Sequence, residues 1–497
     1  DINLEQETHS VLKKLLCPSQ IQQALSGRAA EEEKEKQAGI EEVSHTFSSI
    51  LLGSFRGGAI SANRAAWCKL TSDKFVIDIV YHGLKLRLHD IPVYNTIAVY
   101  PRSLVEDNVI SSEVLSLLRK GVIEPVTHEP GEYLSNLFTV PKGDGRYRTI
   151  LNLKKLNQFC LTDHFKMESV KHVMCMIQPD MYFASVDLKD AFYSIPIHLS
   201  YRKYLKFLWH DKLYQFRCMP NGYNDAMRVF TKILKCPFAS LRERGYLSVV
   251  YVDDSLLMAS DYQSCLQNVA DTVALLQSLG FFVNIEKCEF IPTQTISFLG
   301  FIFDSRRMSI TTTQQKKAKI LEISSRLLSG HIVSIRLVAS YIGRLIACMP
   351  AVPFGKLYYR ALESDKIQAL RHAYGDYDAI MTLSQQAITE VKWWQANLTS
   401  ASSSLYGPPD PDIFIYTDAS NLGWGAHTSA KVSNGRWSDE EAKLHINVLE
   451  LMAIEFGVKC FYRDAHRHIR VMCDNTTAIA YINNMGGQQS KLCHWTA

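Results

Sequence analysis

The sequence lacks several features that are typical of secreted and membrane proteins. Its twelve cysteines are scattered and include no C-x-x-C pair, so they indicate reduced core thiols and not disulfides or a zinc site. There is no signal peptide and no apolar run long enough to cross a bilayer. We therefore expect an intracellular protein, in the cytoplasm, the nucleus or both, without a membrane partner.

An excess of charge of one sign is also absent. The net charge is only +4 over 497 residues. Charge is therefore weak evidence for nucleic-acid binding, because catalytic acids can offset the lysines of a basic groove. The length allows three or four domains, and a hydrophobic content of 47% suits a globular protein. Since the chain begins at Asp1 and not at Met, we expect a fragment of a longer protein.

The most informative stretch is residues 251–254, Tyr-Val-Asp-Asp, between two apolar runs that predict a β-hairpin. Asp is a favoured turn residue, so this pair alone has an equally good structural explanation. A second predicted strand upstream ends near Asp187. Carboxylates from distant strands can share two Mg²⁺ ions, about 3.5–4 Å apart, that stabilise both oxygens of an in-line phosphoryl displacement. The pattern favours Asp187 and Asp253 as bridging ligands, with Asp254 supporting the site more loosely.

Further motifs around these aspartates resemble those of reverse transcriptases in type and order. Their order over roughly half the chain is far more specific than any one motif. The resemblance implies an RNA-directed DNA polymerase that uses an RNA template, a DNA primer, deoxynucleoside triphosphates and two Mg²⁺ ions, with Mn²⁺ as a substitute. The additional motifs are residues 142–148 (the fingers hairpin), 151–157, 219–223 (the template and nucleotide loop), 280–288 and 298–300 (the primer grip).

The same resemblance implies roles for single residues. Phe192 would be the steric gate that excludes a 2′-hydroxyl, and Lys287 would protonate the leaving pyrophosphate. The plainer alternatives are a core aromatic and a surface lysine. Asn221 stands where many family members have Gln, which shortens its reach. The implied substrate-binding residues are Lys142, Arg148, Asp190, Ala191, Phe192, Asn221, Gly222 and Lys287, and Leu188 joins Asp187, Asp253 and Asp254 at the metals.

A second set of acids follows a Ser-, Gly- and Pro-rich linker. Asp418 and Asp474 end two predicted strands, and Glu450 lies on a predicted helix. This order resembles ribonuclease H, which implies that the three acids bind up to two metal ions and direct water against RNA in RNA–DNA hybrids. The family's domain goes on to a fourth acid, whereas this sequence stops at Ala497. We therefore expect slow or absent cleavage by this chain.

The fold class implied is an α+β multidomain protein, a right-hand polymerase with a helical connection and a C-terminal α/β ribonuclease H-like domain. A helical pattern is expected at residues 111–120. Two thumb helices with basic residues are expected after Thr312, the first with Lys316, Lys317 and Lys319 in its basic first half and the second from Ser334 to Cys348; they would hold a duplex by its phosphates. The expected boundaries are an N-terminal extension and linker (1–95), fingers (96–165), palm (166–308, with a fingers insertion near 200–216), thumb (309–365), connection and linker (366–410) and an incomplete ribonuclease H-like domain (411–497).

Two further expectations concern the protein's origin and its alternatives. Residues 67–83 resemble the segment that precedes the polymerase in DIRS-type retrotransposons, which implies a tyrosine recombinase as a possible partner. Two rival interpretations stay open: a domesticated, non-catalytic derivative that binds nucleic acid or protein, and a polymerase that does not copy RNA. The intact acids argue against the first rival, and the ribonuclease H-like segment argues against the second.

Overall fold

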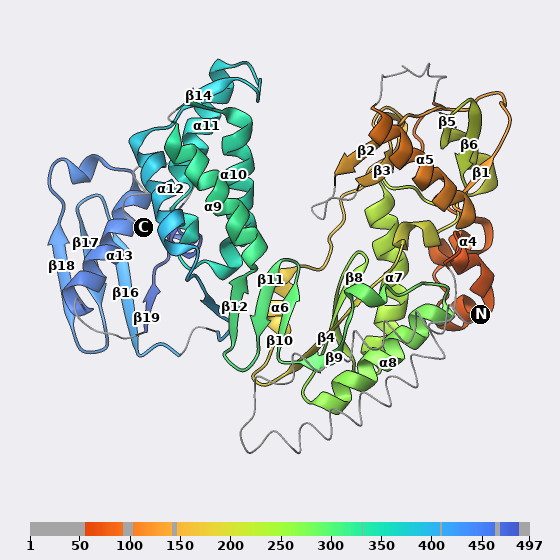
Figure 1. Cartoon of the computed structure of the whole chain (residues 1–497). Coiled ribbons are helices and arrows are strands. Elements are labelled where there is room, and N and C mark those ends of the chain that lie inside the picture. The colour runs from red at the N-terminus through yellow and green to blue at the C-terminus, as the bar shows by residue number, and fades with distance from the viewer. Residues whose placement is uncertain are drawn as a thin grey trace, which may run out of the picture. The chain divides into compact units, whose positions relative to one another are not determined.

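The computed structural model describes residues 55–92, 103–141, 147–330, 332–407, 410–462 and 468–486. The chain divides into two compact units, Asp1–Ile296 and Ser297–Ala497 (Figure 1). Within the described parts, no helix is both long and apolar enough for a bilayer. The ten described cysteines are free. Five of them are buried, but Cys68, Cys175 and Cys460 are exposed, so the expectation of core thiols holds for only part of the set.

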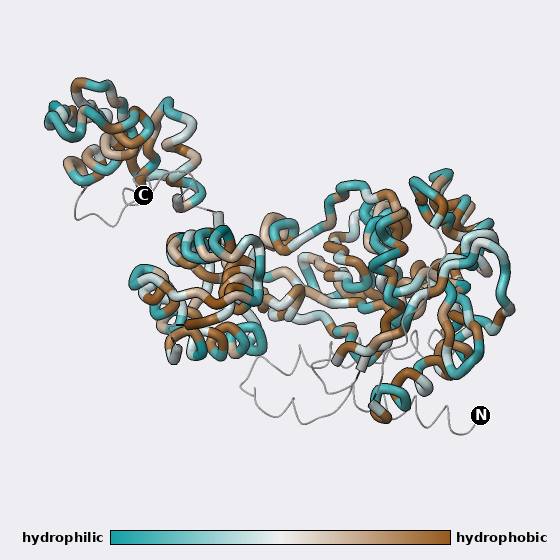
Figure 2. The backbone as a smooth tube through the Cα atoms, turned by 90° about the horizontal axis from the view of Figure 1, so that it is seen from above, coloured by the Kyte–Doolittle hydropathy of each residue, from teal (hydrophilic) through white to brown (hydrophobic). Residues whose placement is uncertain are grey.

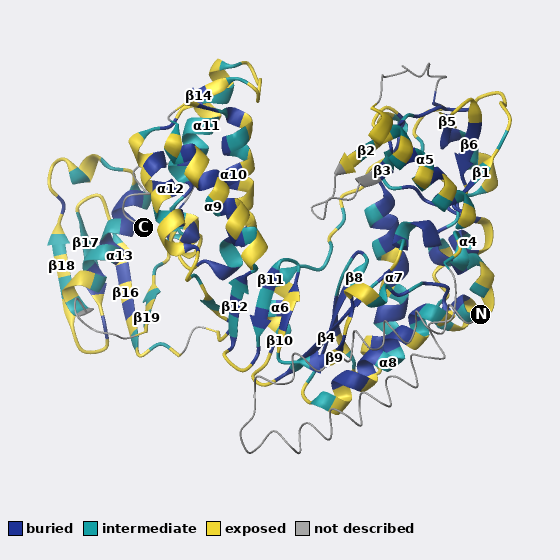
Figure 3. Cartoon of the chain, viewed as in Figure 1, coloured by how far each residue is buried: buried dark blue, intermediate teal, exposed yellow. Residues whose placement is uncertain are grey.

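The centre of the first unit is a four-stranded antiparallel sheet in the order β7-β8-β4-β9. Helices α7 and α8 pack on it, and the buried positions of these elements form its core (Figure 3). Sheet and helices together hold the strand ends that carry the predicted acids. The bounds are β4 (Tyr182–Asp187), β7 (Leu247–Tyr251), β8 (Asp254–Ala259), β9 (Glu289–Thr293), α6 (Val170–Met176), α7 (Ala226–Glu243) and α8 (Tyr262–Ser278).

Beside this sheet the first unit contains a helix, a hairpin and a small three-stranded sheet. Helix α5 (Leu104–Arg119) begins seven residues before the predicted start, because Ser103 and Glu106 form a capping box. Gly121 follows it with a φ of 65°, so the predicted end is close to the observed one. The strands are β1 (Ile123–Pro125), β2 (Leu137–Pro141), β3 (Tyr147–Leu151), β5 (Lys206–Trp209) and β6 (Lys212–Phe216), paired as β2-β3 and β1-β6-β5.

Residues 55–92, in which the sequence shows no chemistry, pack into the same core as the central sheet. They form η2 (Ala59–Asn63), α3 (Arg64–Leu70) and α4 (Lys74–His82). Trp67 is fully buried, and its Nε1 donates a 2.9 Å hydrogen bond to the Leu279 carbonyl. Gly280 lets η2 approach this part of the chain closely, because a Cβ at Gly280 would lie 2.5 Å from the Ala59 carbonyl oxygen. This segment is therefore a structural part of the first unit.

The second unit begins with a sheet and a group of helices. Along the helices, hydrophobic and hydrophilic residues alternate (Figure 2), as amphipathic packing requires. Helices α9 to α12 share one buried core, so the residues after 365 pack together with the two predicted thumb helices. The elements are β10 (Thr295–Phe298), β11 (Phe301–Asp304), β12 (Ser309–Thr312), α9 (Gln314–Ser329), β13 (Ile332–Ser334), α10 (Ile335–Cys348), α11 (Arg360–His372), β14 (Ile380–Thr382), α12 (Gln385–Asn397) and β15 (Ser403–Ser404).

Two lysines of α9 were predicted to lie on an exposed basic face of the helix, but the structure pairs both with the protein itself. Lys317 is buried, and its Nζ donates a 2.7 Å hydrogen bond to the Thr399 carbonyl. Lys316 donates to the Leu299 carbonyl at 2.9 Å and lies over the Phe301 ring. Both ammonium groups thus hydrogen-bond to backbone carbonyls of the second unit, so they are not free to bind the phosphates of a duplex.

The rest of the second unit is a mixed sheet in the order β18-β17-β16-β19, in which β16 and β19 are parallel and the other pairs are antiparallel. Helix α13 packs against β16 and β17. The parallel pair brings the ends of β16 and β19 to one edge of the sheet. The bounds are β16 (Ile413–Ala419), β17 (Gly423–His427), β18 (Val432–Arg436), α13 (Ile446–Tyr462), β19 (Ile469–Met472) and α14 (Thr476–Asn483).

Candidate active site

Three aspartates lie together where β4 and β7 end and β8 begins. Asp187 closes β4 and is the direct cross-strand partner of Asp254, which begins β8. Tyr251 of β7 also pairs with Asp254, so Val252 and Asp253 form the turn between the strands. The Leu188 N–H donates a 2.9 Å hydrogen bond to the Asp253 carbonyl, which ties this turn to the end of β4. The backbone alone therefore brings the three predicted acids together.

The turn itself is strained at one residue. Val252 has a φ of 58°, a region that β-branched side chains rarely adopt. In two-residue hairpins a positive φ at the first central position normally selects Gly. Strain of this kind persists only where the surroundings hold it, and it is concentrated at functional sites. Val252 is largely buried, so packing of its side chain contributes to holding the turn.

The three carboxylates repel one another. Burial raises the pKa of the Asp254 carboxyl to about 7, and the charges of Asp187 and Asp253 add to the effect while Lys287 opposes it. Like charges that share a site disfavour ionisation, and a divalent cation removes that penalty. Hard carboxylate oxygens of this kind are the ligands that Mg²⁺ prefers. The donor set therefore fits a divalent metal.

Asp187 is held from the opposite side by residues of the 280–288 motif. Asn284 donates from Nδ2 to Asp187 Oδ1 at 2.8 Å and from its N–H to the Asp187 carbonyl at 2.8 Å. Lys287 Nζ lies 3.5 Å from Asp187 Oδ2, on a side chain that is 65% exposed. The Cys288 thiol accepts from the Asp187 N–H at 3.2 Å. Asn284 and Cys288 were missed as orienting residues, although their motif was visible in the sequence.

The chain turns sharply just after the end of β4. Asp190 has a φ of 51° and precedes the short helix η4 (Ala191–Ser194). Lys120 Nζ lies 2.7 Å from Asp190 Oδ2. Phe192 is half-buried and packs edge-on against the Phe230 ring, with centroids 5.4 Å apart. The ring is thus partly in the core and partly accessible.

The predicted fingers residues are only partly described. Arg148 lies in β3 opposite Val140 of β2. Lys142 lies outside the described residues.

The loop at residues 219–223 is held at each end. Asn221 Nδ2 donates to the Tyr193 hydroxyl at 3.2 Å. Gly222 has a φ of 103°, and a Cβ there would lie 2.9 Å from the Leu151 carbonyl oxygen, so glycine is required. Asn157 Nδ2 donates to the Gly222 carbonyl at 2.8 Å. The loop is therefore fastened to η4 and to the segment after β3.

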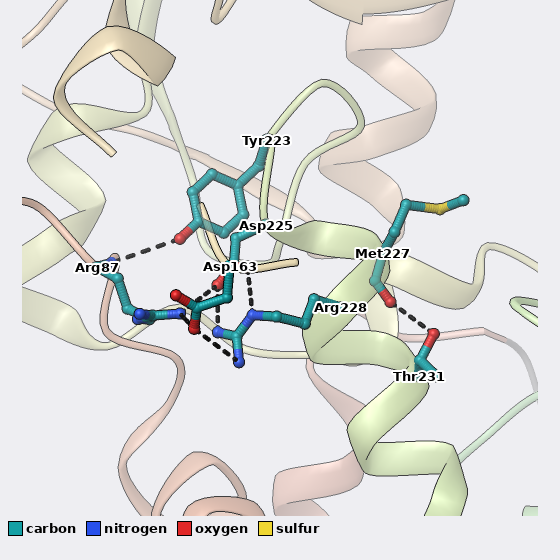
Figure 4. Close-up of polar contacts among 7 residues, drawn as sticks. All are labelled: Arg87, Asp163, Tyr223, Asp225, Met227, Arg228 and Thr231. Atoms are coloured by element: carbon teal, nitrogen blue, oxygen red, sulfur yellow. Dashed lines mark hydrogen bonds and ion pairs between the residues drawn. The ribbon is translucent and has the colours of Figure 1, made fainter. Parts of the chain in front are cut away.

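A partly buried network fixes the end of this loop to α7 and to the N-terminal segment (Figure 4). Arg228 donates from Nε and Nη2 to both oxygens of Asp225, at 2.5 and 2.6 Å, and both side chains are almost fully buried. Arg87 donates to Asp163 at 2.6 Å and lies 3.9 Å from Asp225. The Arg87 N–H also donates to the Tyr223 hydroxyl at 3.4 Å. Nothing in the sequence pattern pointed to this network.

In the second unit, the three other predicted acids gather at the sheet edge formed by β16 and β19. Asp418 lies in β16, and Asp474 follows β19, the strand parallel to it. Glu450 of α13 is buried; burial, followed by the charges of Asp418 and Asp474, raises its carboxyl pKa. The ligand atoms of Glu450, Cys473 and Asp474 lie within 4.8 Å of one another, and Asp418, the third predicted acid, is not in this group. Cys473 is a neighbour that the sequence did not reveal.

Comparison with known proteins finds a family for the segment that contains the first of these sites. Residues 140–303 match the family described as "Reverse transcriptase (RNA-dependent DNA polymerase)". The chain is 28% identical over 217 residues to the "Retrovirus-related Pol polyprotein from transposon opus" of Drosophila melanogaster, covering 42% of this chain and 21% of the relative. It is 22% identical over 382 residues to the "Transposon Tf2-3 polyprotein" of Schizosaccharomyces pombe, covering 72% of this chain and 26% of the relative. The chain thus spans about a fifth to a quarter of the length of these relatives.

Solved structures give the fold. The "foamy viral protease-reverse transcriptase in complex with dsDNA" is similar with a TM-score of 0.59 and 15% identity, over 97% of this chain and 92% of that chain. Its "dRH" form with ds DNA has the same TM-score over 94% of this chain and 74% of that chain. The protein therefore has the α+β polymerase fold of these structures, and the segment that carries the three aspartates of the first unit lies within the residues that match the reverse transcriptase family.

Proposed function

We propose that the protein is an RNA-directed DNA polymerase that copies retrotransposon RNA into cDNA. One observation carries the proposal: the β4–β8 ladder and the strained turn bring Asp187, Asp253 and Asp254 to one point, where burial, followed by the charges of the other two acids, raises the pKa of Asp254. A protein that only bound nucleic acid would gain nothing from such repulsion. The substrates are an RNA template, a DNA primer and deoxynucleoside triphosphates.

The residues around the acids have distinct tasks in this proposal. When bound, two Mg²⁺ ions would stabilise the attacking 3′-hydroxyl and the leaving oxygen at the α-phosphate. Asn284 orients the Asp187 carboxylate through the 2.8 Å hydrogen bond. Phe192 lies beneath the sugar and excludes a 2′-hydroxyl. The exposed Lys287 ammonium protonates the leaving pyrophosphate.

Primer extension tests this proposal directly. We expect Asp253→Asn to abolish extension on an RNA template while the protein stays folded, because a ligand charge at the shared site is lost. The matched control is Asp180→Asn, an exposed aspartate of the same unit with a φ of 62° that Asn also tolerates. Near-normal extension by folded Asp253→Asn would instead support a non-catalytic derivative. Extension on DNA templates alone would support a polymerase that does not copy RNA.

The gathering of Asp418, Glu450 and Asp474 supports a second activity, hydrolysis of RNA in RNA–DNA hybrids. Glu450→Gln should abolish any cleavage of a labelled hybrid. Glu440→Gln, on a side chain that is 93% exposed, is the control. Equal cleavage by both variants would remove Glu450 from the site.

The narrower origin from a DIRS-type element rests on the resemblance at residues 67–83. A reading frame for a tyrosine recombinase beside this one in the genome would support it. An integrase reading frame in that place would contradict it.

A further inference from the structure

An open basic pocket of about 990 Å³ lies in the first unit, outside the acid cluster. Its described lining comes from the N-terminal segment at residues 55–63, from the last turn of α5, and from the end of α8 with the residues that follow it. Lys189 closes one side. The volume is in the range of sites that bind nucleotide-sized molecules.

The charge of the lining has one sign. Arg56, Arg119, Lys120 and Lys189 line the pocket, and no carboxylate stands among the described residues of its wall. Lys120 is paired with Asp190 at 2.7 Å. For the other three cations, the described parts of the chain offer no carboxylate at ion-pair distance. Cations collected around a cavity without counter-charges attract an anion of several charges.

An aromatic surface lies beside these cations. The Phe55 and Phe282 rings, both half-buried and both part of the lining, meet edge to face with centroids 5.2 Å apart. A flat base can stack on a ring of this kind whatever its sequence identity. Cations that can bind phosphate, next to a partly accessible ring, are what a nucleoside polyphosphate requires.

The pocket wall is joined to the acid cluster by short contacts. The Lys189 N–H donates a 2.7 Å hydrogen bond to the Phe282 carbonyl. Lys189 directly follows Leu188, whose own N–H is bonded to Asp253. Lys120, which also lines the pocket, forms an ion pair with Asp190. A ligand in the pocket would therefore adjoin the site of nucleotide addition without occupying it.

We propose that this pocket binds a polyphosphate anion through Arg56, Arg119 and Lys189. The anion has two sources with the same chemistry: the triphosphate of a free nucleotide, with its base on Phe282, and the pyrophosphate released by polymerisation. The pyrophosphate source rests on the proposed function. Binding itself does not depend on that function, because it can be measured in a chain that cannot polymerise.

Calorimetric titration of ATP, inorganic triphosphate and pyrophosphate into the full chain carrying Asp253→Asn tests the proposal. The titration is done with EDTA and without template or primer, so that the metal-dependent site is inactive. We expect saturable binding, weakened about tenfold or more by Arg56→Gln and by Arg119→Gln, since each removes charge-assisted hydrogen bonds. The control Arg244→Gln, at an exposed arginine of the same unit, should bind as the parent does.

The contribution of the Phe282 ring to binding distinguishes the two sources of the anion. Tighter binding of ATP than of inorganic triphosphate, lost in Phe282→Leu, assigns the pocket to a nucleotide. Equal binding of ATP and inorganic triphosphate that is unaffected by Phe282→Leu assigns it to the pyrophosphate group. Absence of saturable binding, or binding that neither arginine substitution weakens, would overturn the proposal. Circular dichroism of each variant confirms that the fold is retained.

Discussion

Asp187 and Asp254 stand directly opposite each other in the ladder between β4 and β8. Like charges at such a position destabilise a sheet, and this pair has a third acid, Asp253, in the adjoining turn. Without a metal ion, the three carboxylates repel one another at the place where the proposed reaction needs them. Stability and activity are therefore expected to respond in opposite directions when one of these charges is removed.

Removing the charge of Asp254 should stabilise the metal-free protein and reduce its activity. We expect Asp254→Asn to gain about 1 kcal/mol in EDTA, which corresponds to a rise in melting temperature of about 2–4 °C. Primer extension should fall steeply. Added Mg²⁺ should raise the melting temperature of the parent more than that of the variant. A variant that melts lower in EDTA, or that gains as much from Mg²⁺ as the parent, would contradict the repulsion.

Shortening the Phe192 side chain should relax the choice of sugar. Phe192→Val is expected to raise ribonucleotide incorporation relative to deoxynucleotide incorporation, because the ring no longer fills the space beneath C2′. Phe192→Tyr keeps the ring and should keep the ratio. The measurement is the ratio of kcat/KM for the two nucleotides on one template. An unchanged ratio in Phe192→Val would leave the ring with only its packing against Phe230.

The two arginines around Asp225 should differ sharply in their effect on stability. Arg228→Met leaves a nearly fully buried carboxylate without its bidentate partner, which should cost about 3–5 kcal/mol. Arg87→Met removes a pair with Asp163 that is 31% and 53% exposed, so its cost should be about 1 kcal/mol or less. Urea unfolding measures both.

A matched control for this comparison lies in the second unit. Arg336 binds both oxygens of Asp378 with the same geometry, but the two side chains are 62% and 72% exposed. Arg336→Met should therefore cost no more than about 1 kcal/mol. Equal losses for Arg228→Met and Arg336→Met would show that burial of the pair is not the cause.

Glu390 should make stability depend on pH. Burial raises its carboxyl pKa from 4.5 to about 7, although the N–H groups of Ala361 and Leu362 donate to it and act in the opposite direction. Between these pH values the folded state holds a proton that the unfolded state has lost. Stability should therefore fall as pH rises from about 4.5 to about 7, by roughly 1.4 kcal/mol per unit.

The test compares urea midpoints of the parent and Glu390→Gln at pH 5 and pH 8. The variant cannot ionise at this position, so it should lose less stability than the parent as the pH is raised. Identical losses in the two proteins would assign the pH dependence to other groups.

Much of the candidate site could be read from local sequence because its signals are local. An apolar run that ends in Asp predicts a strand end, and Ser334 before an amphipathic pattern predicts the start of α10, which is where the structure has it. The start of α5 was missed because Leu104 and Val105 in its first turn are exposed and do not continue the buried apolar pattern, and the turn is held by the capping box at Ser103. Local pattern therefore located acids and helices better than it located their limits.

No local sequence pattern indicated which residues distant in the chain contact one another. Lys317 on its helix predicts a surface cation, yet in the fold its Nζ meets the Thr399 carbonyl. Cys473 shows nothing in its sequence that places it beside Glu450. Residues 55–92 show no chemistry, yet they supply the Trp67 anchor and Arg87.

The sequence by itself determined where the predicted strands end and that acidic residues stand at those ends. Hydrophobic periodicity and motif order depend only on neighbours along the chain. The sequence thereby pointed to the resemblance to reverse transcriptases and to Asp187, Asp253 and Asp254 as the candidate acids. Only the tertiary structure decided which charges are paired, buried or left to line a pocket. The physical reason is that burial and pairing depend on residues such as Arg87 and Asp225, more than a hundred positions apart, which meet only when the core closes.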